Sequence, residues 1–440
     1  MTLLGIPFEF VLFAATLAGV ALFHKRTLPI AVIGMLLIAL YKMLLGSFTS
    51  GTGVAGFLSH LGHEWVILVN LLLLLVGFAL LSKHFERSHL PEILPAVLPD
   101  DWKGPFLLLV IVFVLSAFLD NIAAALIGGS IAAIVFRHKV HVGYIAGIVA
   151  ASNAGGSGSV VGDTTTTMMW LAGISPLAVL PAYIAAGSAL LVTGVFASLQ
   201  QHKFHPIMKN APRNAHVDWN RLFIVVVMLV AAIAVNFYVN NYGGEIGEAL
   251  PFLGVAVWVA LLLCTPLRQP DWKEVPAAVK GAIFLLSLVF AASMMPVEKL
   301  PAASSLTAFQ LGFVSAVFDN IPLTAMAIKQ GGYDWGVLAY AVGFGGSMLW
   351  FGSSAGVAIA TMFPQARSAS AWLRGGWHVA LAYVVGFAVM ALVWGWHPSA
   401  KRGDAPKPAA SAPSSWTVVA TVATAATAAT AATAVANGVR

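Results

Sequence analysis

The sequence predicts an all-α polytopic membrane protein built from two inverted repeats, and three observations lead to this prediction. Hydrophobic residues fill 59% of the 440 positions and charged residues only 9%, with a mean hydropathy of +0.88, which lies far outside the range of soluble proteins. Apolar runs of about 18 to 25 residues, the length that crosses a bilayer, recur along the chain. Two short polar motifs also occur twice, once in each half.

Ten apolar segments are long enough to cross the membrane, namely 6–23, 28–46, 65–82, 142–170, 177–199, 222–240, 249–266, 279–295, 336–362 and 376–396. Two further segments, 105–136 and 305–331, carry an Asp-Asn pair near the middle and charges at both ends. We expect these two to be re-entrant hairpins, which return to the side they entered from. Most of the 23 Lys and Arg residues then fall on one side, as expected for cytoplasmic loops.

Five crossings and one hairpin lie on each side of a basic loop. An odd number of crossings in each copy places the two copies in opposite orientations, so the hairpin tips meet near the midplane. The final segment is rich in Ala, Thr and Pro and is expected to be disordered. The expected units are a first repeat over 1–200 (hairpin 105–136, broken helix 142–170), a cytoplasmic basic linker over 201–221, a second inverted repeat over 222–397 (hairpin 305–331, broken helix 336–362) and a tail over 398–440.

An acid-amide pair is the first duplicated motif, because Asp120-Asn121 in the first half recurs as Asp319-Asn320 in the second. A carboxylate at membrane depth is costly unless it is protonated, paired or bound to a cation. The neighbouring amide adds a neutral oxygen, and hard cations prefer oxygen ligands. An Asx turn that closes each hairpin would use the same residues, and the two interpretations are compatible.

The pattern Gly-Gly-Ser-x4-Gly is the second duplicated motif. Each copy lies midway along an apolar run that is longer than one crossing, which favours a broken helix whose polar residues replace lost backbone partners. Close helix packing is the alternative use of these glycines. Asp163 and the threonines after it favour the break. The residues concerned are Ser152, Asn153, Gly155, Gly156, Ser157, Asp163, Thr164 and Thr165 in the first copy, and Gly345, Gly346, Ser347 and Ser353 in the second.

These motifs together predict one site for ions and protons. If a carboxylate binds either a proton or a sodium ion, and the site faces one side at a time, exchange follows from competition alone. Asp163 and Asp319 are the favoured carriers, with Asp120 third, while Asn, Ser and Thr side chains supply neutral ligands. The expected sodium ligands are Asp120, Asn153, Asp163, Asp319 and Asn320, with Asn121 beside them.

The motifs resemble those of NhaD-type sodium/proton antiporters of the ion transporter superfamily, in the segments 153–156, 162–170, 318–323, 345–347 and 352–357. The resemblance spans residues 60–390. It implies a secondary transporter of the bacterial inner membrane with a scaffold domain that holds a homodimer and a transport domain that moves like an elevator. The same superfamily contains citrate and dicarboxylate carriers and arsenite permeases. Their Ser-Asn-Thr motif is matched only in part by Ser152-Asn153-Ala154, and Gly158–Val161 depart from the NhaD pattern, which leaves the ion open.

Three function classes therefore stand side by side. Sodium/proton antiport comes first. A sodium-coupled citrate or dicarboxylate symporter, or an arsenite permease, is the alternative, although no Lys or Arg lies near the glycine motifs. An intramembrane aspartyl protease is a distant third, because a duplicated site has no use in a protease. We thus expect no enzyme activity and no cofactor beyond sodium and protons. The expected partners are a small inorganic cation or small solute, the lipid bilayer and a second copy of the chain, but no nucleic acid.

Overall fold

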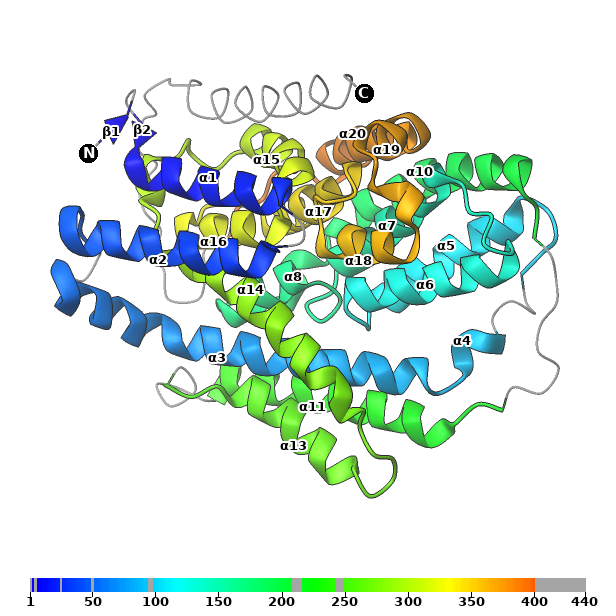
Figure 1. Cartoon of the computed structure of the whole chain (residues 1–440), viewed down its shortest axis with the longest axis horizontal. Coiled ribbons are helices and arrows are strands. Elements are labelled where there is room, and N and C mark those ends of the chain that lie inside the picture. The colour runs from blue at the N-terminus through cyan, green and yellow to red at the C-terminus, as the bar shows by residue number, and fades with distance from the viewer. Residues whose placement is uncertain are drawn as a thin grey trace.

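The computed structural model of the chain describes residues 2–3, 6–23, 26–48, 51–93, 98–207, 216–242 and 249–399. Within these ranges the regular structure is helical apart from one pair of two-residue strands, β1 (Thr2–Leu3) and β2 (Ile6–Pro7). Figure 1 shows most of the helices running along the long axis of the molecule. The prediction of an all-α polytopic protein is confirmed. The expected disordered tail lies outside the described residues, except for its first two positions.

Four stretches of described helix are long and apolar enough to cross a bilayer by themselves. They are α2 (Thr27–Leu45), α3 (Gly53–Glu86), the run of α9 (Pro176–Val179) and α10 (Ala182–Phe204), and the run of η3 (Trp272–Glu274) and α14 (Val275–Ser293). A fifth forms if α19 (Ala369–Gly375) and α20 (Trp377–Val393), which meet at 61°, count as one span. Shorter apolar stretches occupy α1 (Phe8–Leu22), α11 (Trp219–Tyr242) and α13 (Phe252–Cys264). The count of ten crossings stays a prediction.

Each predicted hairpin consists of two helices joined by a tight turn. The first pairs α5 (Lys103–Ser116) with α6 (Asn121–Val135), and the second pairs α15 (Ser305–Val317) with α16 (Asn320–Gln330). Both turns end in an aspartate that caps the second helix. The Asp120 carboxylate accepts a 3.2 Å hydrogen bond from the Ile122 amide, and that of Asp319 accepts one of 3.0 Å from the Ile321 amide.

Both glycine motifs interrupt helices. The first separates α7 (Val142–Ser157) from α8 (Thr164–Leu171), and the second separates α17 (Trp335–Gly345) from the 3₁₀ turn η5 (Gly346–Met348) and α18 (Ser354–Met362). The same glycines also allow close packing. A Cβ on Gly155 would overlap the carbonyl of Phe113 in α5, and one on Gly345 would overlap the backbone of Gly312 in α15. Both proposed uses of glycine, the break and the close approach, therefore occur together.

The two halves pair reciprocally. The hairpin helix α6 packs against α18 of the second half, and the hairpin helix α16 packs against α8 of the first. The broken helices α7 and α17 contact each other, and α10 packs along α20. Each hairpin thus contacts the broken helix of the other copy.

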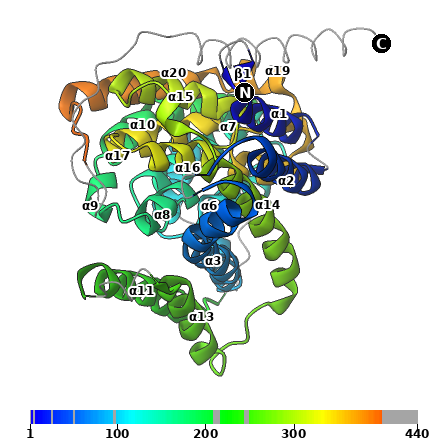
Figure 2. The ribbon, with the colours of Figure 1, turned by 90° about the vertical axis from the view of Figure 1, so that its left-hand side faces the viewer.

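A second group of helices flanks this bundle. α1, α2, α14 and part of α3 share a core with Phe318 and Ile321 at the second hairpin tip. α11 and α13 pack on α3, and Figure 2 shows them at the edge of the molecule far from α15 and α20. Three short elements, α4 (Leu90–Ile93), η4 (Val297–Lys299) and η6 (Pro364–Arg367), connect longer ones. The predicted basic linker is described only over 201–207 and 216–221.

Candidate functional site

The carboxylate of Asp163 is enclosed at the break between α7 and α8, where the residue is 1% exposed. Its Oδ1 accepts hydrogen bonds from the backbone amide and the hydroxyl of Thr165, at 2.8 and 2.9 Å. Its Oδ2 accepts one of 3.0 Å from the side-chain amide of Asn121. No ion pair among the described residues includes Asp163. A buried carboxylate with only neutral donors requires a proton or a cation to offset its charge.

The side chain of Asn153 connects the first hairpin to both broken helices. Its Oδ1 accepts a 3.0 Å hydrogen bond from Asn121, and its Nδ2 donates to the hydroxyls of Ser347 at 2.9 Å and Ser353 at 3.1 Å. Asn153, Ser347 and Ser353 are all fully buried. These four residues, from the first hairpin and the two broken helices, therefore form one enclosed polar network beside Asp163.

Asp319, at the tip of the second hairpin, contacts the same region through α18. In addition to its capping bond, its Oδ2 accepts a 3.3 Å hydrogen bond from the hydroxyl of Ser354, the first residue of α18. Asp163 lies within electrostatic reach of both Asp120 and Asp319. The three aspartates that the sequence singled out are thus gathered around the helix N-termini of both halves.

The two halves of this region differ in one respect that bears on binding. Counted from the shared Gly-Gly-Ser, Asn153 corresponds to Gly343 and Asp163 corresponds to Ser353. Asn320 is 2% exposed, yet its Nδ2 has no hydrogen-bond partner among the described residues, whereas the equivalent Nδ2 of Asn121 has two. A Cβ on Gly343 would lie 3.8 Å from Asp163 Oδ2. The second copy therefore keeps Asn320, the amide of the Asp-Asn pair. It has Gly343 and Ser353 where the broken helix of the first copy has Asn153 and Asp163.

Two threonine hydroxyls donate hydrogen bonds to backbone carbonyls of the interrupted segment. The hydroxyl of Thr166 donates to the carbonyl of Ser159 at 2.6 Å, and that of Thr167 donates to the carbonyl of Val160 at 2.9 Å. The sequence pattern, in which the whole threonine run favours the break, singles out Thr164 and Thr165 as site residues but not Thr166, Thr167 or Ser354. A usable signal was present for Ser354, because it directly follows the residue equivalent to Asp163.

Several predicted site residues lie in or beside the breaks without contacting an acid. The hydroxyls of Ser152 and Ser157 donate to carbonyls of their own helix, Val149 at 2.9 Å and Ala154 at 2.8 Å. Thr164 is buried, but no side-chain hydrogen bond to an aspartate is formed by it. The remaining glycines act by packing, since a Cβ on Gly156 or Gly346 would meet the backbone of Gly162 or Gly352.

In the described part of the chain, no three His, Cys, Asp or Glu side chains are arranged to hold a metal ion. A cation beside Asp163 would therefore draw mainly on neutral oxygens.

The citrate transporter family model matches residues 10–345, which is more than half of the chain. The chain belongs to the citrate transporter family. It is therefore an integral multi-pass membrane protein and a secondary transporter rather than an enzyme, and its resemblance to NhaD-type antiporters of the ion transporter superfamily is confirmed.

Three relatives are similar in sequence to part of this chain. Sodium/proton antiporter 1 of Arabidopsis thaliana is 27% identical over 297 residues, which cover 57% of this chain and 49% of the relative. Sodium/proton antiporter 2 of the same plant is 25% identical over 291 residues, 57% of this chain and 67% of the relative. The Na(+)/H(+) antiporter NhaD of Vibrio parahaemolyticus is 24% identical over 306 residues, 56% of this chain and 70% of the relative. The match spans about half the length of the first of these proteins.

Proposed function

We propose that this member of the citrate transporter family exchanges sodium ions for protons, with Asp163 as the group that binds either one. The observation that carries the proposal is the surroundings of Asp163, a buried carboxylate with three neutral donors and no ion-pair partner in the described residues. An anionic solute would add negative charge to a site that has no described basic side chain. The names of the three relatives, all sodium/proton antiporters, support the same activity.

Competition at one carboxylate produces exchange. A proton neutralises Asp163 by covalent attachment, and a sodium ion does so by coordination, so the two exclude each other. Thr165 and Asn121 hold the carboxylate in a fixed orientation, which lets a small cation reach it without reorganisation of the ligands. Asn153 ties α7 to η5 and α18, so the two broken helices move as one unit. Movement of this unit past α1–α3 and α14 would expose the site alternately to the two sides, as an elevator does.

The decisive experiment uses everted membrane vesicles loaded with a pH-sensitive dye and challenged in turn with sodium, lithium, potassium and citrate. We expect sodium to drive proton movement in the native protein. Asp163→Asn and Asp319→Asn should each abolish it, because the amide can no longer exchange a proton for a cation. Unchanged exchange in both variants would contradict the proposal.

Asp334 provides a matched control, because it is also a buried aspartate that caps a helix. It is 2% exposed and accepts hydrogen bonds from the Val337 amide at 3.1 Å, the Trp394 indole at 3.1 Å and the His397 amide at 2.9 Å. All of these partners lie outside the acidic site. Asp334→Asn should lower the melting temperature and leave the sodium dependence of exchange unchanged. An equal loss of exchange in this control would show that any buried aspartate is needed merely for folding.

A second candidate is sodium-coupled uptake of citrate or a dicarboxylate. The specific observation that favours it is the amide donor of Asn320, which has no hydrogen-bond partner among the described residues and suits a carboxylate oxygen; the description of the matching family points the same way. Uptake of labelled citrate and succinate into vesicles tests it. Sodium-dependent uptake that is lost in Asn320→Ala, without sodium-driven proton movement in the native protein, would favour this candidate over antiport.

A further inference from the structure

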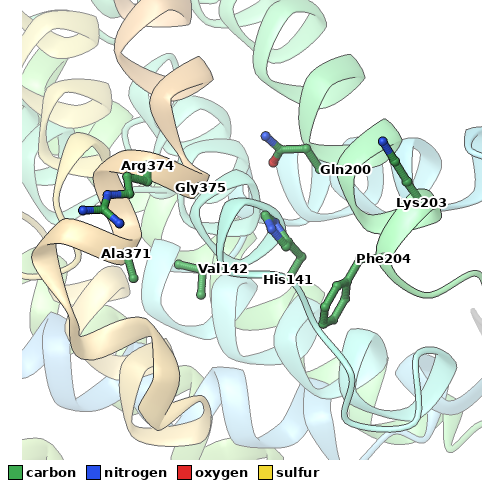
Figure 3. A pocket seen from close by; sticks show the side chains of 8 residues that line it. All are labelled: His141, Val142, Gln200, Lys203, Phe204, Ala371, Arg374 and Gly375. Carbon is green, nitrogen blue, oxygen red and sulfur yellow. The ribbon is translucent and has the colours of Figure 1, made fainter.

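A surface hollow of about 670 Å³ lies at the other end of α7 from the acidic site. Figure 3 shows it between the start of α7, the end of α10 and α19, with His141 in the middle and Lys203 and Arg374 on opposite sides. Gln200 and Phe204 complete the wall on the α10 side. Because α7 has 16 residues, the hollow is about 24 Å from the break that holds the acidic site, at about 1.5 Å per residue. It is therefore separate from the proposed transport function.

The two long cations of this hollow have no partner of opposite charge in the described part of the chain. Lys203 and Arg374 are exposed, and neither forms a hydrogen bond or an ion pair with a described residue. Elsewhere Lys83 and Arg268 pair with acidic side chains. The residues that line the hollow include no Asp or Glu. The charge of the hollow is therefore available to a negatively charged ligand.

The wall of the hollow is held in place by a second glutamine. Gln201 accepts a 2.8 Å hydrogen bond from the His141 amide and donates to the carbonyls of Lys139 at 3.1 Å and His205 at 2.9 Å. In His141 itself, Nδ1 accepts a 3.1 Å hydrogen bond from the Gly143 amide, so the proton of the neutral ring is on Nε2, which can donate. The segment that carries His141 is thus fixed before any ligand arrives, which lowers the entropy cost of binding.

The side chains around this hollow are of the kinds expected at the level of lipid headgroups. Large apolar side chains are exposed beside it: Phe204 is 56% exposed, Leu373 51% and Trp377 46%. Trp377 packs on Phe196, with ring centroids 5.0 Å apart. Aromatic residues are enriched at the membrane interface, and Lys and Arg in cytoplasmic loops. Lys203, in the last turn of α10, and Arg374, in α19, belong to segments that the alternation of predicted crossings places on the Lys- and Arg-rich, cytoplasmic side.

We propose that this hollow binds the phosphate group of an anionic phospholipid from the cytoplasmic leaflet. Lys203 and Arg374 contact the phosphate oxygens, His141 donates a further hydrogen bond, and the acyl chains lie along the exposed apolar side chains. Basic pockets between helices on the cytoplasmic side suit such headgroups, and charge-assisted hydrogen bonds to phosphate are strong.

Native mass spectrometry of the detergent-solubilised full chain tests the proposal. Phosphatidylglycerol is titrated in, with zwitterionic phosphatidylcholine as the reference lipid. We expect one phosphatidylglycerol to bind the native protein at least tenfold more tightly than it binds the double variant Lys203→Ala/Arg374→Ala. The matched control Lys273→Ala/Lys280→Ala removes two exposed lysines of η3 and α14, also predicted to lie on the cytoplasmic side, and should behave as the native protein. Equal phosphatidylglycerol binding by all three proteins would overturn the proposal, as would an equal loss in the control.

Two further measurements keep the test conclusive. Lys203→Gln/Arg374→Gln retains length and polarity, so it replaces the alanine pair if that pair does not elute as a folded species. In the native protein, the tight phosphatidylglycerol must dissociate as the sodium chloride concentration rises, because salt screens the attraction. Thermal unfolding with inorganic phosphate in place of lipid separates the two sources of phosphate. Protection by inorganic phosphate equal to that by phosphatidylglycerol would reject the lipid and leave a site for a soluble anion.

Discussion

The side-chain amide of Asn153 donates a 2.9 Å hydrogen bond to the hydroxyl of Ser347, although the two residues are 194 positions apart. The same side chain accepts a hydrogen bond from Asn121, which also donates to Asp163. One neutral residue therefore fixes the relative positions of a hairpin tip, two helix breaks and the buried acid. Because every member is enclosed, removal of this residue leaves the Ser347 hydroxyl unpaired among the described residues and takes one of two hydrogen bonds from Asn121 and from Ser353.

Asn153→Ala should lower both stability and sodium affinity. Asn121, Ser347 and Ser353 each lose a partner, and a buried unsatisfied group costs about 1–3 kcal/mol. The half-maximal sodium concentration for exchange should rise at least tenfold, because the ligands around Asp163 are no longer held. Thermal unfolding in detergent and dye-based exchange over a sodium series measure the two effects.

Asn70→Ala is the matched control for this variant. Asn70 is 8% exposed, and its Oδ1 accepts a 2.9 Å hydrogen bond from the Gly254 amide between α3 and α13, away from the acidic site. It should lose stability and keep the native sodium dependence. If both variants shifted the sodium dependence equally, the Asn153 network would have no special relation to the ion.

The duplicated motifs predicted the hairpins and the breaks because their causes are local. An aspartate at a hairpin tip caps the helix that follows it, as Asp120 and Asp319 do, and this depends only on the next two residues. A Gly-Gly pair lowers the cost of leaving the helix wherever it occurs. The acids could be singled out for a similar reason, since the charge of a carboxylate within an apolar run must be offset in any fold.

The contacts between the halves could not be predicted in the same way. The bond from Asn153 to Ser347 depends on how two distant segments pack, and no spacing in the sequence encodes that distance. The directions of side chains were also inaccessible. Ser152 and Ser157 were assigned to the site, yet both hydroxyls donate to their own helix. The sequence likewise held no sign that the Asn320 amide lacks a hydrogen-bond partner among the described residues, or that Gly343 lies beside Asp163.

Gly343→Ala should reduce sodium affinity without loss of stability. The added methyl group would lie 3.7 Å from Ser157 Cβ and 3.8 Å from Asp163 Oδ2, which are ordinary contact distances, so the fold tolerates it. The methyl group nevertheless occupies space beside the carboxylate that a cation needs. We expect a melting temperature close to the native one and a several-fold rise in the half-maximal sodium concentration.

Gly345→Ala, two positions further along, is the contrasting variant. Its Cβ would overlap the backbone of Gly312, which cannot move aside as a flexible side chain can. This variant should be markedly destabilised or fail to accumulate. A stable Gly345→Ala protein, or native sodium affinity in Gly343→Ala, would each contradict the packing described around the second break.

Lys329→Met should loosen the second hairpin from the flanking helices. The Lys329 ammonium, in the last turn of α16, donates to the carbonyls of Ser293 at 2.5 Å and Met295 at 2.6 Å, where α14 ends. Methionine keeps the length and removes the donor. Hydrogen bonds to charged groups contribute about 1.5–3 kcal/mol each, so hydrogen exchange of the α16 amides should become faster. Hydrogen-exchange mass spectrometry of both proteins in detergent measures the change.

Lys42→Met supplies the comparison, because Lys42 donates to the neighbouring carbonyl of Met294 at 2.7 Å but belongs to α2. Its effect should appear in α2 and the end of α14, with α16 exchanging at the native rate. Identical exchange patterns in the two variants would mean that Lys329 does not specifically hold the hairpin.

Acidification should remove one stabilising contact between the helices α3, α11 and α13. Asp218 accepts a 2.7 Å hydrogen bond from Arg268, and its backbone amide donates to the carbonyl of Ser88 at 2.8 Å. The Arg268 guanidinium holds the pKa of the Asp218 carboxyl below its usual value. The folded state therefore releases this proton more readily than the unfolded state. The resulting stability is present above the ordinary aspartate pKa of about 3.9 and is lost as the pH falls through the lower, folded value.

The measurement compares thermal unfolding of the native protein and Asp218→Asn in detergent at pH 7, 5, 4 and 3. At pH 7 the native protein should be more stable by at most about 1 kcal/mol, because the pair is partly exposed and screened by solvent. The difference should shrink below about pH 4, where aspartates become protonated in the unfolded chain. Asp101→Asn, which affects a looser pair with Lys103 at 3.9 Å, should differ little from the native protein at any of these pH values. A difference for Asp218→Asn that stayed constant down to pH 3 would place its cause in packing rather than in the charge of the carboxylate.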